Sequence, residues 1–356
     1  MTPATTTMDA DVVLAGLAAG TPPIGLEDVP ELMSRVDHKY IVTAETMVLL
    51  AAELRDRFAV LSIDGRRQFR YSSTYFDTPD LLTYEQHRQN RRRRFKLRTR
   101  TYVDSGGRWL ELKLNGTRGS TDKHRIPYDD APAHALTGPA LDFVSDTLVS
   151  ELHLTAPDPL GPVLSTDYRR VTLVDRSGTA RLTCDTGLIC RNTALNHRND
   201  DPNRPDTGPS HRDGSSLNPG NPGPGRRDGS LDPGNPGPGR PDGRPDYGNQ
   251  GPGSGDGGVD HGDTGGDGGM DRRNDDRRVA ARRDLVLLES KSTDGRAVVD
   301  RVLRGLGARP VTVSKYCLAV AALHRRRANR WRPVLQHYLE PEPQTFEARR
   351  PPPIFW

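Results

Sequence analysis

The sequence RRRRFKLRTRTY, residues 91–102, decides the fold. Successive side chains of a β-strand point to opposite faces, so Phe95 and Leu97 share one face and the cations share the other. Adjacent cations on one face repel one another unless that face meets water or a polyanion. The pattern predicts a strand that is apolar outside and basic inside, as in a barrel with a charged lumen. A solvated basic patch or a nucleic-acid-binding stripe remains the alternative.

Other segments of the chain repeat this alternation. Residues 108–114 place three leucines on one face and Trp109, Glu111 and Lys113 on the other. The inward-facing charged or polar positions predicted in this way are Arg94, Lys96, Arg98 and Arg100; Glu111 and Lys113; Arg181 and Asp185; Glu289 and Lys291; Asp37 and Lys39; Lys123 and Arg125; and Tyr168 and Arg170. A sandwich with a polar outer face is the competing interpretation, but outer faces rarely favour cations this strongly.

Composition divides the 356 residues into parts. Residues 196–278 consist mainly of Gly, Pro, Asp, Asn and Arg, and such a segment buries too little apolar surface to offset its chain entropy. We therefore expect a disordered insert at 196–278 within a single domain formed by residues 29–195 and 279–325. Residues 1–28 are expected to be a disordered leader, and residues 326–356 a basic, Pro-rich tail. The pI of about 9.0 fits acidic partners, although the net charge of +4 is modest.

Several classes of protein are disfavoured by the same sequence. Three cysteines, Cys184, Cys190 and Cys317, are an odd number without metal-type spacing, so we expect neither a disulfide framework nor a zinc site. The N-terminus shows no basic segment followed by an apolar core, and no apolar run approaches the roughly 20 residues needed to span a bilayer. The expectation is a cytoplasmic protein without a transmembrane segment. The oligomeric state does not follow from the sequence.

A series of motifs resembles a known family. The order of the motifs is similar to that of the VTC domain, the polyphosphate polymerase domain of the vacuolar transporter chaperone, which belongs to the triphosphate tunnel metalloenzyme superfamily. The match runs from about residue 34 to 323 without the insert. The motifs are Arg-x-Asp-x-Lys-Tyr (35–40), Tyr-x-Ser-x-Tyr-Phe-Asp-Thr (71–78), Arg-x-Lys-x-Arg-x-Arg-x-Tyr (94–102), Leu-Glu-x-Lys (110–113 and 288–291), Tyr-x-Arg (168–170) and Ser-Lys-Tyr (314–316).

The resemblance implies an α+β fold: an antiparallel eight-stranded β-barrel with flanking helices, whose lumen binds a phosphate chain. It implies catalytic roles for Arg98, Arg100, Lys39 and Lys291. Glu289 and Glu111 would hold Mn²⁺ or Mg²⁺. The residues expected to bind substrate are Arg94, Lys96, Lys113, Lys123, Arg125, Tyr168, Arg170, Arg181 and Lys315. The expected partners are a nucleoside triphosphate and inorganic polyphosphate, and no nucleic acid.

The chemistry agrees with these assignments. Phosphoryl transfer needs positioning and charge neutralisation more than covalent help, and Arg binds phosphate through a planar fork that stays charged. The hydrolase branch of the superfamily carries Glu-x-Glu-x-Lys on its first strand, where this chain has Arg35, Asp37 and Lys39. Fewer carboxylates favour metal-dependent transfer between phosphates over hydrolysis. The alternatives are a tripolyphosphate or nucleoside triphosphate hydrolase and a non-catalytic polyphosphate- or nucleic-acid-binding module.

Overall fold

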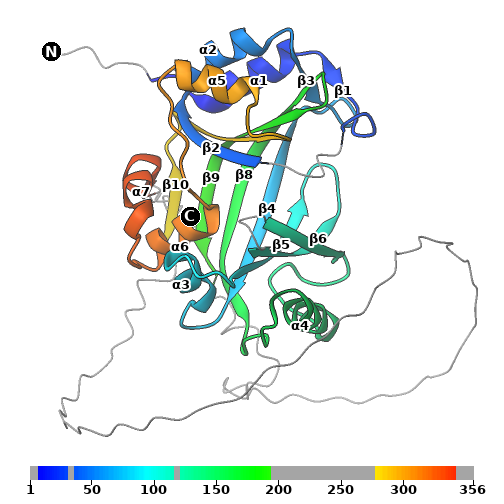
Figure 1. The fold of residues 1–356 in the computed structure, drawn as a ribbon, viewed down its shortest axis with the longest axis vertical. Coiled ribbons are helices and arrows are strands. Elements are labelled where there is room, and N and C mark those ends of the chain that lie inside the picture. The colour runs from blue at the N-terminus through cyan, green and yellow to red at the C-terminus, as the bar shows by residue number, and fades with distance from the viewer. Residues whose placement is uncertain (1–6, 31–35, 116–120, 194–276, 342–356) are drawn as a thin grey trace, which may run out of the picture. The chain divides into compact units, whose positions relative to one another are not determined.

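The computed structural model describes residues 7–30, 36–115, 121–193 and 277–341 (Figure 1). Most of the predicted insert, 196–276, lies outside the described residues, as do Arg35 and the end of the predicted tail. None of the described helices combines the length and apolar character needed to cross a bilayer.

Eight strands form one curved antiparallel sheet, in the spatial order β2-β11-β9-β8-β4-β5-β6-β7. Among the described residues no ladder joins β2 to β7, so the barrel-like sheet is open along that seam. The predicted antiparallel eight-stranded architecture is confirmed, without full closure. The strands are β2 (Val36–Thr43), β4 (Gln68–Asp77), β5 (Phe95–Tyr102), β6 (Arg108–Asn115), β7 (Thr121–Pro127), β8 (Gly161–Asp175), β9 (Ala180–Asn192) and β11 (Leu285–Ser292).

Shorter elements flank this sheet. β1 (Pro23–Ile24) pairs with β3 (Phe58–Leu61), and β3 pairs antiparallel with β8. β10 (Arg278–Ala281) pairs with β9 on one side and with β12 (Leu339–Pro341) on the other. The helices are α1 (Ala10–Gly20), α2 (Ala44–Leu54), α3 (Leu82–Arg88), α4 (Gly138–Leu152), α5 (Val298–Gly305), α6 (Lys315–Leu323) and α7 (Arg332–Tyr338), with a 3₁₀ turn at Asn329–Trp331.

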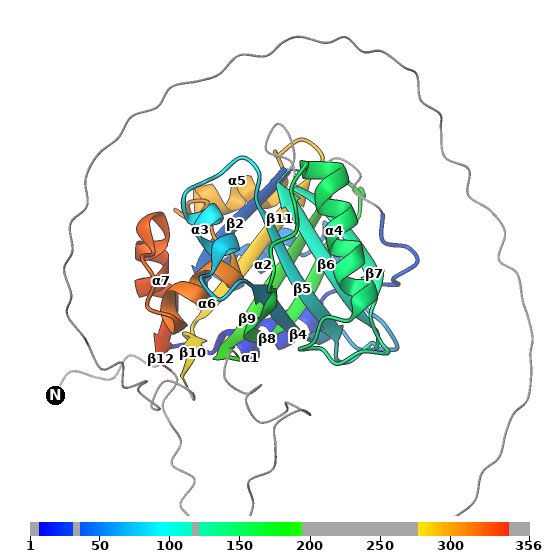
Figure 2. The same cartoon turned by 90° about the horizontal axis from the view of Figure 1, so that it is seen from below.

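Two groups of helices cover the outer face of the sheet (Figures 1 and 2). α1, α2 and α5 bury apolar residues against β2, β8, β9 and β11, and Thr43 begins α2 by accepting the N–H of Thr46 at 3.3 Å. α4 packs over β5 and β6, where Phe95 and Leu97 are almost fully buried. Strand alternation therefore leaves the charged residues of β5 on the inner face.

The third core lies on the inner face. α6 contributes Tyr316 and Cys317, which pack with Tyr75, Tyr168 and Leu287 of three different strands. Tyr75 shares the inner face with Arg98, because the Arg98 guanidinium donates to its hydroxyl at 3.2 Å. α6 thus fills part of the concave side, and charged side chains occupy the rest.

The expected leader and tail are corrected by the structure. Residues 10–20 form α1, capped by Asp9, and Leu14 of this helix is fully buried against the outer core. The expected tail is folded as far as Pro341, because Trp331 and Tyr338 bury against α6 and β10. In both segments the burial of a few apolar side chains stabilises folded structure, although most of the other residues are small or basic.

Candidate functional site

Strand β5 has the two-faced character that its sequence predicts. Phe95 and Leu97 pack beneath α4, while Lys96, Arg98 and Arg100 alternate with them and project to the inner face. The concave side of the sheet, onto which these side chains project, is called the lumen below. Every further charged group of the site reaches the lumen from another strand or from the start of α6.

Arg98 and Glu111 form a buried pair in the lumen. They are direct cross-strand neighbours on β5 and β6, and Arg98 Nε donates to Glu111 Oε2 at 2.8 Å. Burial favours the neutral acid, but Arg98, Arg100 and Lys113 outweigh it and hold the pKa of Glu111 well below its usual range. The second oxygen, Oε1, is buried without a hydrogen-bond partner among the described residues. Glu111 thus fixes the Arg98 guanidinium and keeps one acceptor unused.

A second fixed guanidinium belongs to Arg170 on β8. Asp185, its cross-strand neighbour on β9, accepts from Arg170 Nε at 2.6 Å and from Nη2 at 2.8 Å. Lys315, the first residue of α6, also donates to Asp185. Burial opposes ionisation, yet these two cations lower the pKa of Asp185 to about 2. Asp185 therefore orients one Arg and one Lys at the same place.

Two tyrosines form a platform beside these cations. The rings of Tyr71 and Tyr168 stack with centroids 5.3 Å apart. Arg100 and Arg170 lie over the Tyr71 ring at 5.6 and 5.1 Å, and Lys315 Nζ lies 4.3 Å from the Tyr168 ring centroid. Burial alone would raise the pKa of Tyr168, but Arg100, Arg170 and Lys315 outweigh burial and lower it. The platform holds the cations in position through cation–π contacts.

Glu289 lies where cations from four strands converge. Its Oε1 is 3.2 Å from Lys291 Nζ, and it faces Lys39 across the β11–β2 ladder. Although burial opposes ionisation, Lys291, Lys39, Arg170 and Lys113 hold the pKa of Glu289 well below normal. Because β2, β6, β8 and β11 all contribute, Glu289 marks the centre of the lumen.

The lumen holds more positive than negative charge. The described cations on it are Lys39, Lys96, Arg98, Arg100, Lys113, Arg170, Lys291 and Lys315, and the carboxylates that they surround are Glu111, Asp185 and Glu289. Repulsion from Arg98, then burial, pushes the pKa of Lys113 well below normal. Burial, with repulsion from Lys39, lowers the pKa of Lys96. Both shifts follow from burial and from the close approach of other cations.

Unpaired polar atoms also face the lumen. Arg100 Nε and the hydroxyls of Ser73 and Thr183 are buried without hydrogen-bond partners among the described residues. Ser73 is the cross-strand neighbour of Arg100, and Thr183 that of Glu289. Buried polar atoms normally find a partner, so this set indicates space for water or a polar ligand.

Comparisons with known proteins bear on this arrangement. The family model of the VTC domain matches residues 34–324. The chain belongs to the VTC domain family. Among curated proteins, none matches the chain.

Solved structures give weaker likenesses to this VTC domain. A putative adenylate cyclase from Bacillus halodurans is 17% identical, with a TM-score of 0.31, over 44% of this chain and 73% of that one. A putative adenylate cyclase from Vibrio parahaemolyticus is 14% identical, with a TM-score of 0.27, over 44% and 70%. A putative adenylyl cyclase from Hippeastrum, described as having a dominant triphosphatase activity, is 16% identical, with a TM-score of 0.31, over 47% and 83%.

Four residues expected to bind substrate lie away from the centre of the VTC lumen. Arg94 precedes β5 and donates to the carbonyl of Arg91. Lys123 and Arg125 lie on the edge strand β7, where both are exposed, and Arg125 stacks on Trp109 at 4.3 Å. Arg181 donates to the carbonyl of Pro30 at 2.7 Å.

Sequence reasoning placed Asp185 on the inner face and Tyr71, Ser73 and Tyr75 in a family motif, but it assigned no binding or catalytic role to these residues or to Thr183. Period-two alternation within their strands places all five on the inner face. That spacing was the available signal, but cross-strand register was needed to identify their partners.

The metal assignment can be tested against these contacts. The described residues contain no group of three or more His, Cys, Asp or Glu side chains that could hold an ion. Glu289 and Glu111 each already face basic side chains. Mg²⁺ and Mn²⁺ need only one or two protein carboxylates when phosphates supply further oxygens, and Glu111 Oε1 is still free to accept. The residues therefore fit a metal ion whose other ligands are oxygens of the bound phosphate.

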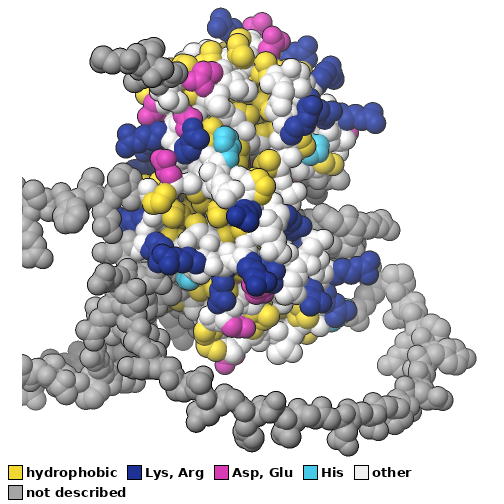
Figure 3. Space-filling view, turned by 90° about the vertical axis from the view of Figure 1, so that its left-hand side faces the viewer, with side chains coloured by type: hydrophobic (Ala, Val, Ile, Leu, Met, Phe, Trp, Pro, Cys, Tyr) yellow, Lys and Arg dark blue, Asp and Glu magenta, His cyan; other side chains and the backbone are white. Residues whose placement is uncertain are grey.

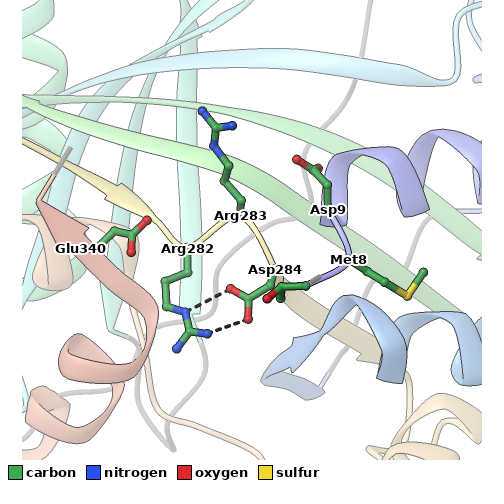
Figure 4. A pocket seen from close by; sticks show the side chains of 7 residues that line it. Met8, Asp9, Arg282, Arg283, Asp284 and Glu340 are labelled. Carbon is green, nitrogen blue, oxygen red and sulfur yellow. Dashed lines mark hydrogen bonds and ion pairs between the residues drawn. The ribbon is translucent and has the colours of Figure 1, made fainter. Parts of the chain in front are cut away.

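A separate groove lies outside the lumen. It encloses about 300 Å³ and is lined by Met8, Asp9, Glu340 and the segment Arg282–Asp284 (Figure 4). Arg282 and Asp284 pair with each other at 2.7 Å across it. This groove shares no residue with the lumen and is not part of the candidate site.

Proposed function

We propose that this VTC domain binds triphosphate or polyphosphate in its lumen and transfers phosphoryl groups from a nucleoside triphosphate to inorganic polyphosphate. The observation that carries the proposal is the excess of cations over carboxylates on the inner face. An enclosed cluster of like charges costs free energy in the empty protein, and a polyanion removes that cost. A chain of phosphates offers closely spaced negative charge along the same direction as the strands.

Fixed guanidiniums suit the chemistry. In the transition state the transferring phosphoryl group carries charge on its oxygens. Catalysis consists mainly of positioning this group and neutralising its charge. Arg98 and Arg170 are oriented in advance by Glu111 and Asp185, so they lose little freedom on binding phosphate. Arg100 keeps an unpaired Nε for a phosphate oxygen. In this proposal Lys39 and Lys291 neutralise charge at the transferring group, beside Glu289.

The proposal includes a divalent metal, Mn²⁺ or Mg²⁺. Glu289 and Glu111 would hold it, and when bound it would supply positive charge that neutralises the phosphate oxygens. The remaining work falls to the chain itself. The lysines around Glu289 keep its carboxylate ionised and therefore able to bind a cation near neutral pH.

Hydrolysis of a triphosphate is the competing reaction for the same lumen. Transfer is favoured by the sequence of the first strand. Asp37 and Lys39 share one face of it, and Asp37 is the one carboxylate there. Activation of water by a metal is helped by more carboxylates than this strand provides. Non-catalytic binding of polyphosphate is the third outcome considered.

Incubating the full chain with ATP and Mn²⁺, and measuring both long-chain polyphosphate and free phosphate, tests the proposal. Long chains are expected from the wild type and from Arg70→Ala, and none from Arg100→Ala. Arg70 is a matched control because it lies on the adjacent strand but is exposed and pairs with Asp104 outside the lumen. Free phosphate without chains would identify a hydrolase. Formation of neither product would indicate a non-catalytic binding module.

A further inference from the structure

A second group of arginines lies outside the lumen. Two short runs, Arg91–Arg93 before β5 and Arg325–Arg327 after α6, expose all six side chains to solvent. These six residues are called the arginine patch. None of them was assigned a role by the family motifs or by the lumen contacts.

Both runs are connected to α3. Arg91–Arg93 follow that helix closely in sequence, and Tyr84 within it donates its hydroxyl to the carbonyl of Arg327 at 2.8 Å. Arg330, just after the second run, donates to the carbonyl of His87 at 3.1 Å. Figure 3 looks onto the side of the molecule that carries α7 and shows Lys and Arg side chains over both its upper and its lower half. The patch is therefore one surface built from segments far apart in sequence.

A groove lies between α3 and the first run. Its volume is about 360 Å³, and it is lined by Leu82, Glu85, Gln86, Gln89 and Arg91–Arg93. Glu85 is the carboxylate in this lining, and it is paired with Arg88, whose Nε donates to it at 2.7 Å. The carboxylate that lines this groove is thus already paired with a residue outside the patch.

Positive charge continues from the patch into the lumen. Arg94 and Lys96 follow the first run along β5 and lead to Arg98. Burial, then repulsion from Arg330, lowers the pKa of Arg94. Burial, with Lys96, Arg94 and Arg330 adding to it, lowers the pKa of His87 to about 2. Basic side chains therefore continue along the chain from the first run to Arg98 in the lumen.

We infer that the arginine patch binds the part of a long inorganic polyphosphate chain that extends beyond the lumen. The inference rests on the proposed function, since it concerns the same ligand. A nucleic acid fits less well, because single strands bind through aromatic rings on which bases stack. Tyr84 and Trp331, the aromatic residues at the patch, are 0% and 2% exposed. The patch offers charge without a stacking surface, which suits a polyanion without bases.

The test compares two ligands, tripolyphosphate and a polyphosphate of about sixty phosphates, on five proteins. The patch variants are Arg91→Gln/Arg92→Gln/Arg93→Gln and Arg325→Gln/Arg326→Gln/Arg327→Gln. The matched control, Arg55→Gln/Arg57→Gln/Arg176→Gln, removes the same charge from exposed positions beside α2 and β8. Arg100→Ala reports on the lumen, and the wild type is the reference. A single-stranded DNA serves as a third, competing polyanion.

Each patch variant is expected to bind the long chain roughly tenfold more weakly than the control, the scale of three exposed charge contacts. Tripolyphosphate affinity should stay within about twofold of wild type. Equal affinity of patch and control variants for the long chain would overturn the inference, and so would a loss confined to DNA. Failure of the proposed function looks different: Arg100→Ala would then bind tripolyphosphate as tightly as wild type.

Discussion

Among single residues, Glu289 has the most unusual surroundings. It is the carboxylate on which cations from four strands converge, and its pKa is held low by Lys291, Lys39, Arg170 and Lys113 against the effect of burial. A residue in this position can serve either as a metal ligand or as a counter-charge that holds the lysines. Replacing it with the isosteric amide separates the two roles.

In Glu289→Gln we expect metal-dependent turnover to collapse, because the ligand loses its charge at nearly constant size. Tripolyphosphate binding without metal should persist or strengthen, since the lumen becomes more positive. Titration calorimetry with and without Mn²⁺, next to turnover, measures both. If the variant kept the metal dependence of the wild type, Glu289 would be a structural partner of Lys291 only.

Lys96 and Lys113 give the empty protein a characteristic pH dependence. Their pKa values are lowered from 10.5 in the folded state by burial and by neighbouring cations. The unfolded chain therefore binds more protons than the folded chain between the lowered values and about 10.5, and stability rises with pH in that window. Raised pKa values of the buried Cys184 and Cys190 oppose the rise above their usual value of 9.

Urea unfolding of the free protein should accordingly show stability increasing as the pH rises toward the usual lysine value of 10.5, up to about pH 9, where the cysteines begin to oppose it. Lys113→Met should reduce the increase by removing one of the two groups. Saturating tripolyphosphate should also reduce it, because bound phosphate returns the lysine pKa values toward normal. A flat or falling curve for the free wild type would mean that the lumen cations are already compensated.

Among the elements, α6 is the one whose placement most affects the site, because it begins with Lys315. The buried carboxylate of Asp77, at the end of β4, accepts the backbone N–H groups of Thr83 and Tyr84 in α3 and the hydroxyl of Tyr316 in α6. One carboxylate therefore ties a strand to two helices. The adjacent Lys315 then reaches Asp185.

Tyr316→Phe and Tyr40→Phe form a matched pair for this connection. Tyr40 donates to Asp300 of α5 at 2.8 Å, so each substitution removes one hydrogen bond to a buried aspartate. Both should lower the free energy of unfolding by about 1.5–3 kcal/mol. Only Tyr316→Phe should also weaken tripolyphosphate binding, through Lys315. Equal binding by both variants would show that α6 does not position the site.

The comparison of sequence with structure is also clearest among the elements. Period-two alternation predicted the inner face of β5, β6 and β11, because side-chain direction in a strand follows from backbone geometry alone. It did not predict the partner of Glu111: whether that carboxylate meets a metal or Arg98 depends on the β5–β6 register. Arg181 has the predicted spacing, but its guanidinium donates a hydrogen bond to the carbonyl of Pro30. α1 was missed because its Ala-rich sequence becomes a core helix only through packing on α2 and β9.

For the whole molecule, the ends that flank the predicted insert are informative. Arg191 pairs with Arg278, and Cys190 with Val279, so β9 and β10 are neighbouring antiparallel strands. A short turn could join them in place of the insert, and surface connections tolerate changes in length at small cost.

Deletion of residues 196–276 with a short Gly-containing turn should therefore preserve a cooperative unfolding transition and tripolyphosphate affinity. The insert contributes few apolar residues, so little burial should be lost. Thermal unfolding and calorimetric titration against the full chain are the measurements. Loss of the cooperative transition would show that the insert belongs to the folded core.

The central claim is that one face of the chain's basic strand packs and the other binds phosphate. Titration of tripolyphosphate into wild type, Arg100→Ala and Leu97→Ala, with an unfolding curve for each, tests it most directly. Arg100→Ala should weaken binding about ten- to a hundredfold, the worth of one charge-assisted contact. Leu97→Ala should keep its affinity and lose about 2–5 kcal/mol of stability, because Leu97 is fully buried under α4. A loss of ligand in Leu97→Ala, with Arg100→Ala unaffected, would contradict the account.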